Sequence, residues 1–169
     1  GEEAGAFPRR TGMASGEFVQ ALSLVRYAAG NGEYRAIFRG VQLEFSPQGF
    51  RAVASDGYRL ALYDLPLPQG FQAKAVVPAR SVDEMVRVLK GADGAEADLA
   101  LGEGVLALAL EGGSGVRMAL RLMEGEFPDY QRVIPQEFAL RVQVEGEALR
   151  EAVRRVSVLS DRQNHRVDL

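Results

Sequence analysis

Groups of short alternating segments, set between isolated helices, limit the folds open to this chain more than any other feature. In each segment apolar and polar residues alternate, as in a strand with one buried face, and glycine, proline or Asp-Gly turns separate the segments. Four segments follow a first helix and three follow a second, at 36–45, 50–54, 60–65, 73–77, 97–101, 105–110 and 116–122. This order predicts an α+β fold in which both helices pack on one face of antiparallel sheets.

The two helices are identified by apolar residues at the helical period. The first is expected over residues 16–29, where glycines follow it. The second is expected after Pro78, where Ser81 and Glu84 form a capping box. Their apolar stripes consist of Phe18, Leu22, Val25 and Ala29 in the first helix and of Val82, Met85, Val86 and Leu89 in the second. A short strand near 12–15 is a further candidate.

A pattern of elements near the start of the chain recurs 130 residues later. Gly16-Glu17 opens the first helix, and Gly146-Glu147 opens another after an alternating segment at 138–145. A Phe-Pro pair precedes both stretches, at Phe7-Pro8 and at Phe127-Pro128. The recurrence indicates tandem copies of one fold. We therefore expect a linker at 1–10, a complete domain at 11–136 and the truncated start of a second copy at 137–169.

Composition narrows the classes of function. The 169 residues carry a formal net charge of −3, no cysteine and one histidine, His165. Without cysteine the chain has no disulfide or thiolate metal site, and no nucleophile–base pair or spaced carboxylate cluster is evident. No segment has the run of about 18 apolar residues that spans a bilayer, and the first residues do not resemble a signal peptide. We expect a cytoplasmic protein with no catalytic residues, no cofactor and no metal.

Two glycine-containing segments are interpreted as turns. Residues 112–115 lie between two predicted strands and do not open a helix, which predicts a hairpin and not a phosphate-binding loop. Asp56-Gly57 is likewise typical of a hairpin turn between strands.

Basic residues gather on the predicted helices, with acidic neighbours such as Asp83 and Glu84. The basic set consists of Arg26, Arg80, Arg87, Lys90, Arg150 and Arg154. Two interpretations are open: a solvated helix face, or a mildly basic surface turned toward a polyanion. The net charge of −3 argues against a protein held on nucleic acid by dense phosphate contacts, but not against one that surrounds DNA loosely.

Two stretches resemble a known family. Residues 53–61 read Val-Ala-Ser-Asp-Gly-Tyr-Arg-Leu-Ala, and residues 125–135 read Gly-Glu-Phe-Pro-Asp-Tyr-Gln-Arg-Val-Ile-Pro. The first is similar to a motif in the middle domain of the bacterial DNA sliding clamp, the beta subunit of DNA polymerase III. The second is similar to the stretch that joins the middle and last domains of that clamp. The resemblance covers essentially the whole chain.

The resemblance implies a fold and a role. Members of the family form a ring of two identical chains, each with three copies of one fold, and the helices line a hole for duplex DNA. They have no catalytic activity and act as processivity factors. The resemblance also implies partners: the polymerase III catalytic subunit, the clamp loader and repair proteins, which bind through short linear peptides.

The same resemblance implies a peptide-binding cleft between the middle and last domains. The matching positions are Arg35, Ile37, Phe38, Ser55, Gly57, Tyr58, Arg59, Leu60, Pro128, Arg132 and Val133. Apolar members of this set would form a pocket for a leucine or aromatic anchor, and its arginines would bind polar groups at the rim. The last domain would supply the other wall.

A different class of function stays open. The chain is also consistent with a free-standing peptide-binding or assembly domain that uses a sheet edge and has no role on DNA.

Overall fold

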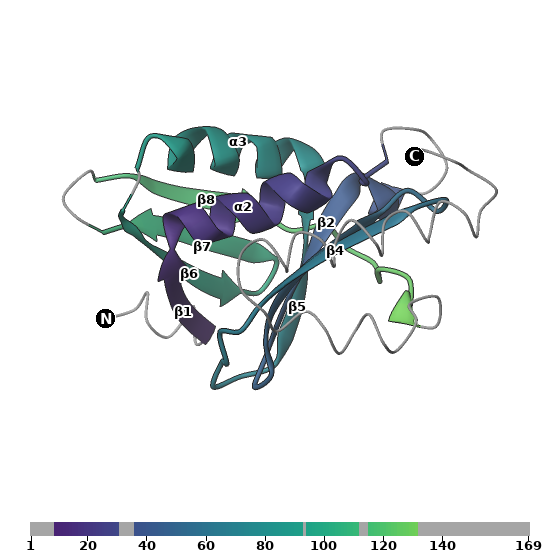
Figure 1. Cartoon of the computed structure of the whole chain (residues 1–169), viewed down its shortest axis with the longest axis horizontal. Helices are drawn as coiled ribbons and strands as arrows, with labels where there is room; N and C mark the ends of the chain where they lie inside the picture. The colour runs from purple at the N-terminus through teal and green to yellow at the C-terminus, as the bar shows by residue number, and fades with distance from the viewer. Residues whose placement is uncertain (1–8, 31–35, 93, 112–114, 132–169) are drawn as a thin grey trace.

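The computed structural model describes residues 9–30, 36–92, 94–111 and 115–131, and within them the chain forms two four-stranded antiparallel sheets and two α-helices (Figure 1). Sheet I has the strand order β1-β6-β7-β8 and sheet II the order β4-β3-β2-β5. Sheet I comprises β1 (Arg9–Ala14), β6 (Glu96–Gly102), β7 (Val105–Leu110) and β8 (Arg117–Arg121). Sheet II comprises β4 (Leu60–Leu65), β3 (Gly49–Ser55), β2 (Gly40–Ser46) and β5 (Ala73–Pro78).

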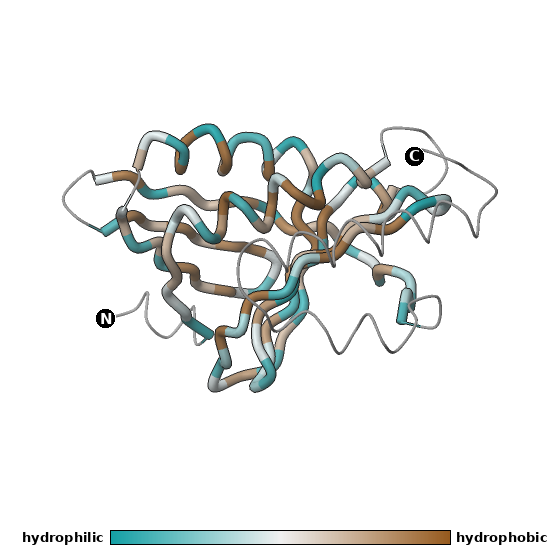
Figure 2. Tube along the Cα trace, in the orientation of Figure 1, coloured by the Kyte–Doolittle hydropathy of each residue, from teal (hydrophilic) through white to brown (hydrophobic). Residues whose placement is uncertain are grey.

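The helices α2 (Ser15–Arg26) and α3 (Ala79–Lys90) lie side by side and pack against the two sheets (Figure 1). Their buried residues are Ser15, Phe18, Ala21, Leu22 and Val25 on α2 and Ala79, Val82, Met85 and Leu89 on α3. Apolar residues recur along these helices and strands (Figure 2), and the buried ones form one core. The predicted α+β class, with two helices on antiparallel sheets, is confirmed.

The described domain is an internal duplication that the sequence analysis did not predict. Strand, helix and three strands occur twice, as β1-α2-β2-β3-β4 and as β5-α3-β6-β7-β8. The two halves exchange their first strands, because β1 pairs with β6 and β5 pairs with β2. Each half therefore completes the sheet of the other, and neither half forms a closed hydrogen-bonded unit alone.

The segment predicted as a strand at 36–45 is different at its start. Ala36–Arg39 form a 3-10 helix, η1, and β2 begins only at Gly40. Ile37 and Phe38 are neighbours in the chain and both are buried, whereas successive side chains of a strand point to opposite faces. In the 3-10 turn Ile37 joins the core, whereas Phe38 packs against Phe127.

The predicted capping box at Ser81 is wrong, because α3 begins at Ala79 with Pro78 as its N-cap and no side-chain cap. β5 runs directly into the helix, so Ser81 already lies inside the first turn. The N-terminal boundaries also differ from those expected. β1 begins at Arg9, inside the segment 1–10 predicted as a linker, and α2 begins at Ser15, where the candidate short strand was expected to end.

Each sheet has an inner face toward the helices and an outer face away from them. In sheet II, Phe50 on β3 packs edge-on against Phe18 of α2, with ring centroids 6.0 Å apart, so Phe50 faces inward. Because side chains alternate along a strand, Arg51 and Val53 on the same strand face outward. The outer face of sheet II is thus the side of this sheet that the helices leave uncovered.

Candidate peptide-binding surface and helix face

The turn between β3 and β4 contains three of the predicted site residues, two more (Ser55 and Leu60) flank it, and the turn is ordered by its own hydrogen bonds. The Asp56 carboxylate oxygen Oδ1 accepts from the amides of Tyr58 (2.9 Å) and Arg59 (3.0 Å). The Ser55 hydroxyl donates to the Arg59 carbonyl (2.7 Å) and accepts from the Gly57 amide (3.1 Å). Gly57 has φ +95°, a conformation that favours glycine. The turn is thus preformed, and it exposes Tyr58, of which 49% is accessible.

Arg59 joins this turn to the C-terminal end of α2. Its Nη2 donates to the Tyr27 carbonyl (2.8 Å), and its guanidinium lies over the Tyr27 ring, 5.1 Å from the centroid. Its Nε forms an ion pair with Asp56 Oδ2 at 3.2 Å. Arg59 thus holds the turn against the helix, and its predicted contact with peptide groups at the rim stays a prediction.

Three apolar members of the predicted site, Ile37, Phe38 and Leu60, are buried. Leu60 begins β4. It faces outward from sheet II because it pairs with Ser55, which lies four residues from the outward-facing Arg51 on β3 and therefore on the same face. Ile37 and Phe38 lie on η1, where the Phe38 carbonyl accepts from the Gly30 amide at 2.7 Å. Less than a tenth of each of these three side chains is exposed.

Residues 122–131, here called the connector, leave β8 and contact the outer side of sheet II. The Met123 amide donates to the Val76 carbonyl of β5 (2.8 Å). Phe127 is buried and packs edge-on against Phe38 and Tyr130, with centroid distances of 6.5 and 6.3 Å. Pro128, a predicted site residue, directly follows Phe127 in the chain and is half-buried. Phe38 thus contacts the residue that directly precedes Pro128.

A polar network that the sequence analysis missed fixes Tyr130. Arg51 binds Asp64 through two hydrogen bonds, Nε to Oδ1 (2.6 Å) and Nη2 to Oδ2 (2.8 Å). Its Nη1 donates to the Tyr130 hydroxyl (3.1 Å), which in turn donates to Glu44 Oε2 (2.5 Å). Gln42 Nε2 donates to the same Glu44 oxygen (2.9 Å). The register could have indicated this network, because Glu44, Arg51 and Asp64 face each other on β2, β3 and β4.

Burial and charge act together on this network. Burial raises the pKa of the Tyr130 hydroxyl; Arg51 opposes that change and Glu44 adds to it. Burial alone would lower the pKa of Arg51, but the hydrogen bond and charge of Asp64 outweigh it, so the pKa is raised. Arg51 is therefore charged and Tyr130 is a proton donor at neutral pH.

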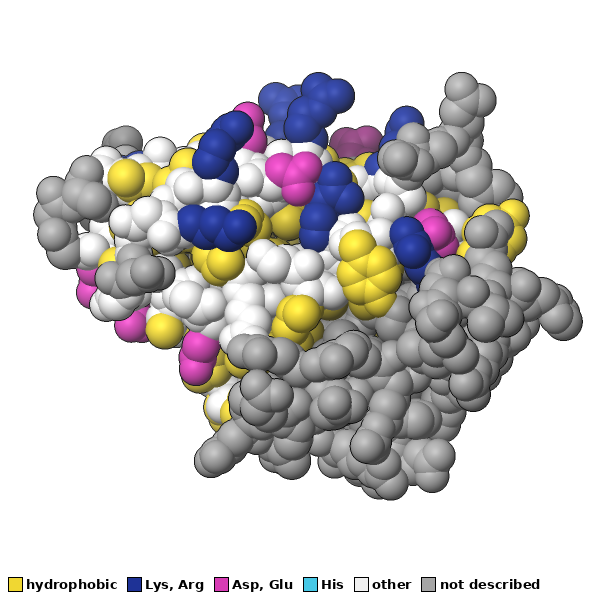
Figure 3. Space-filling model, turned by 45° about the horizontal axis from the view of Figure 1, so that its top comes forward, with side chains coloured by type: hydrophobic (Ala, Val, Ile, Leu, Met, Phe, Trp, Pro, Cys, Tyr) yellow, Lys and Arg dark blue, Asp and Glu magenta, His cyan; other side chains and the backbone are white. Residues whose placement is uncertain are grey.

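The helix face carries cations and carboxylates together (Figure 3). Arg26 of α2 forms a two-bond ion pair with Asp83 of α3, at 2.8 and 3.1 Å, which ties the helices together at their surface. Arg87 lies 3.8 Å from Glu84, and Arg80 is exposed. The two helices carry four cations and three carboxylates: Arg26, Arg80, Arg87 and Lys90 with Glu17, Asp83 and Glu84. The surface is thus only mildly basic.

Several predicted residues lie outside the part of the chain that the structure describes: Arg35, Arg132, Val133, Arg150 and Arg154. The second copy expected at 137–169 lies outside it too. Among the described residues, no group of three or more carboxylates and histidines is arranged to hold a metal, and no helix is long and apolar enough to cross a membrane.

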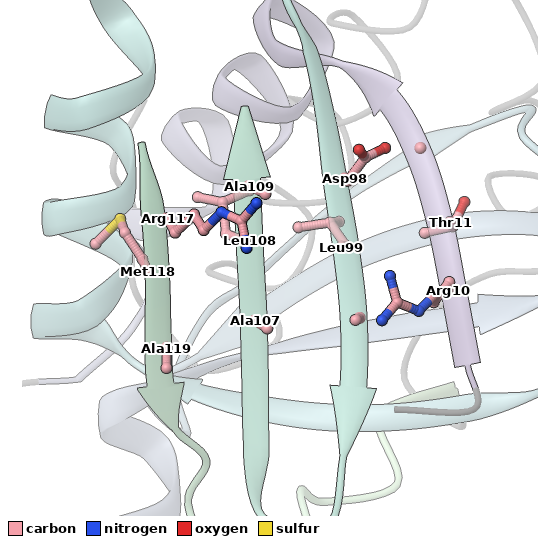
Figure 4. Close-up of a pocket in the computed structure, with 12 residues that line it drawn as sticks. Arg10, Thr11, Asp98, Leu99, Ala107, Leu108, Ala109, Arg117, Met118 and Ala119 are labelled. Carbon is pink, nitrogen blue, oxygen red and sulfur yellow. The ribbon is translucent and has the colours of Figure 1, made fainter. Parts of the chain in front are cut away.

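A groove of about 700 Å³ lies on the outer face of sheet I, away from the predicted site (Figure 4). Small side chains form much of its lining: Gly12, Ala100, Ala107, Ala109 and Ala119. Arg10, Asp98 and Arg117 project from β1, β6 and β8 on the same side (Figure 4). None of the predicted site residues lines it.

Comparison with known proteins identifies the family. Residues 13–129 match the family model of the DNA polymerase III beta subunit, central domain. The chain belongs to this family. It is 31% identical over 164 residues to the beta sliding clamp of Streptomyces coelicolor, covering 92% of this chain and 42% of that protein. It is 32% identical over 149 residues to that of Haemophilus influenzae, covering 88% and 40%.

Solved structures agree with the match to the beta subunit family. The crystal structure of the DNA polymerase III beta subunit from Thermotoga maritima superimposes with a TM-score of 0.70 at 26% identity, over 76% of this chain and 34% of that one. The resemblance seen in residues 53–61 and 125–135 is therefore confirmed, as is the clamp fold. The chain spans about two fifths of the length of the curated relatives it matches. The boundaries at 10 and 136 stay predictions.

Proposed function

We propose that this chain is the central part of a DNA polymerase processivity clamp. In the full-length protein, a ring of two identical chains, α2 and α3 would face duplex DNA in the hole, and the outer side of sheet II with the connector would form one wall of a peptide-binding cleft. The protein would tether the polymerase III catalytic subunit, the clamp loader and other partners without catalysing a reaction. The match of residues 13–129 to the central domain of the beta subunit carries this proposal.

The charge of the helix face supports a loose contact with DNA. The helices α2 and α3 carry four cations and three carboxylates, and one of these cations, Arg26, forms an ion pair with Asp83. A protein that neutralises many phosphates binds tightly and loses affinity steeply with salt. The surface of these helices is suited to the opposite case, in which DNA passes by without a fixed register.

The geometry of sheet II supports a peptide-binding role. The β3–β4 turn is held by Asp56 and Ser55 and presents Tyr58 to solvent. Leu60 starts the adjoining strand on the outer face, and the connector brings Pro128 to that side of the sheet through Phe127. A rigid turn beside an apolar surface suits a short peptide with a leucine or aromatic anchor. Arg35, Arg132 and Val133 join this proposal on the resemblance alone.

A peptide titration tests the cleft. A labelled Gln-Leu-x-Leu-Phe-type peptide is titrated onto the full-length protein and onto its Leu60→Ala and Val133→Ala variants. We expect the dissociation constant to rise by about tenfold or more in each, which corresponds to about 1.4 kcal/mol of lost binding energy. Leu106→Ala is the matched control, because Leu106 is equally buried but faces inward from sheet I. If Leu106→Ala weakens binding as much as Leu60→Ala does, or if neither cleft variant changes it, the cleft assignment is wrong.

Retention on DNA tests the ring. After loading, the full-length protein should remain on a nicked circular duplex and leave the same duplex once it is linearised. Equal retention on both forms would rule out topological tethering. Equal retention combined with intact peptide binding would instead favour the peptide-binding domain without a DNA role.

A further inference from the structure

The connector makes three contacts, two with sheet II and one with the adjoining η1. Met123 binds the β5 backbone at Val76 and passes so close to Gly40 that a Cβ there would lie 2.6 Å from the Met123 sulfur. Phe127 packs on Phe38, and Tyr130 reaches the polar network on β2, β3 and β4. The first two contacts involve main chain and apolar surface, whereas Tyr130 makes the specific polar contact.

The network is arranged so that Tyr130 completes it. Asp64 takes two donors of the Arg51 guanidinium, which leaves Nη1 for the Tyr130 hydroxyl. Glu44 accepts from Gln42 and from that same hydroxyl. Tyr130 thus supplies an acceptor to the cation and a donor to the second carboxylate. Only 6% of Tyr130 is exposed, so both bonds are largely shielded from water.

Pro128 lies between the two aromatic residues of the connector, Phe127 and Tyr130, and Phe127 is in contact with Phe38. If the Tyr130 hydroxyl loses its partners, the connector keeps its apolar contact at Phe127 but loses the polar bonds that hold it beyond Pro128. The position of Pro128 therefore depends on residues that are not themselves in the cleft.

We propose that Tyr130 is a positioning residue for peptide binding. Tyr130, Arg51 and Glu44 form a hydrogen-bonded set, here called the latch, which holds the connector on sheet II so that Pro128 can form part of the cleft wall. The inference rests on the proposed peptide-binding function. It gives the network a role in affinity for partners, beyond its contribution to folding.

The test is peptide titration onto full-length protein carrying Tyr130→Phe, which keeps the ring and removes only the hydroxyl. We expect affinity to fall about tenfold, as for loss of a hydrogen bond to a charged group. Tyr63→Phe is the matched control: Tyr63 is a buried tyrosine of the same sheet, but it pairs with Ala52 and faces the helices. Peptide affinity in Tyr63→Phe should stay within about twofold of wild type, since surfaces away from the site change binding little.

Hydrogen exchange supplies a readout that a general loss of stability would not reproduce. In Tyr130→Phe, without peptide, the connector amides from Met123 to Gln131 should exchange faster while those of β6 and β7 are unchanged. Glu44→Gln is the second variant. We expect it to weaken binding less than Tyr130→Phe and to add little when combined with it, because both act on one hydrogen bond.

The outcomes separate the two proposals. If the wild-type protein binds no peptide, the proposed cleft fails. If the wild type binds and Tyr130→Phe binds as well as Tyr63→Phe does, the cleft stands and the latch is wrong. Faster exchange across both sheets in Tyr130→Phe would also overturn the latch, since the hydroxyl would then act on the fold as a whole.

Discussion

Sheet I and sheet II are built on the same arrangement of strands, yet their outer faces differ at one row of side chains. In each sheet the row crosses three neighbouring strands of the duplicated unit, at paired positions. The row consists of Glu44, Arg51 and Asp64 in sheet II and of Ala100, Ala107 and Ala119 in sheet I. The charged row binds Tyr130 of the connector, and the alanine row lies in the groove of sheet I (Figure 4).

This difference shows how one duplicated fold acquires two distinct surfaces. Backbone pairing gives both sheets the same shape, but only the charged row offers donors and acceptors that a buried tyrosine hydroxyl can satisfy. Val53 and Leu62, which share the outer face with Arg51, are almost fully buried. Arg117 and Ala119 on the outer face of sheet I are exposed. The contact between sheet II and the connector therefore depends on the side chains of one face and not on the fold that the two sheets share.

The largest effect should come from removing the cation of the charged row. Arg51→Met leaves Asp64 and Glu44 without their positive partner in a largely buried site, which should lower the free energy of unfolding by about 3 kcal/mol. Ala107→Met introduces the same residue at the corresponding half-exposed position and should change it by no more than about 0.5 kcal/mol. Urea unfolding of the full-length protein measures both. Similar losses in the two variants would show that the rows are equivalent.

A smaller effect should arise where the connector meets β2. A Cβ at Gly40 would lie 2.6 Å from the Met123 sulfur and from Val76 Cγ1, so Gly40→Ala should lower the free energy of unfolding by about 2 kcal/mol through overpacking. At Gly16, in the first turn of α2, an added Cβ would have no neighbour within 4 Å. Gly16→Ala should therefore raise stability by about 0.5 kcal/mol. A neutral Gly40→Ala variant would contradict the close approach of the connector.

The smallest effect concerns the charges of the helix face. Asp83→Asn breaks an exposed ion pair with Arg26 and should cost at most about 0.5 kcal/mol of unfolding free energy. It also removes a negative charge from the proposed DNA-facing surface, so association with duplex DNA at low salt should strengthen modestly. Asp98→Asn makes the same charge change on the outer face of sheet I and serves as the control. An equal gain from Asp98→Asn would show that the helix face has no special relation to DNA.

Much of the fold was predictable because local patterns dominate it. Alternation located most of the strands to within about two residues, and the stripes through Phe18 and Val82 located both helices. The errors occurred where tertiary contacts override local patterns. At Ile37 and Phe38 a 3-10 turn precedes the strand, and at Ser81 a strand that runs directly into a helix replaced the capping box.

The duplication and the latch were not predicted, for a different reason. β1 and β5 begin 64 residues apart, as do α2 and α3, but β2 and β6 begin only 56 residues apart, so no single spacing repeats. Glu44, Arg51 and Asp64 follow the alternation expected of solvent-facing residues, and only the strand register places them side by side. The motif at 125–135 indicated the family, but it did not indicate that Tyr130 binds this row.

In the proposed function, partner peptides bind at sheet II and the connector and not at the alanine-lined groove of sheet I. Hydrogen exchange of the full-length protein, with and without a saturating Gln-Leu-x-Leu-Phe-type peptide, tests it directly. We predict slower exchange in the β3–β4 turn around Tyr58 and in the connector from Met123 to Gln131, with β7 and β8 unchanged. Protection confined to β7 and β8, with the turn and the connector unaffected, would show that the peptide binds at sheet I and not at sheet II.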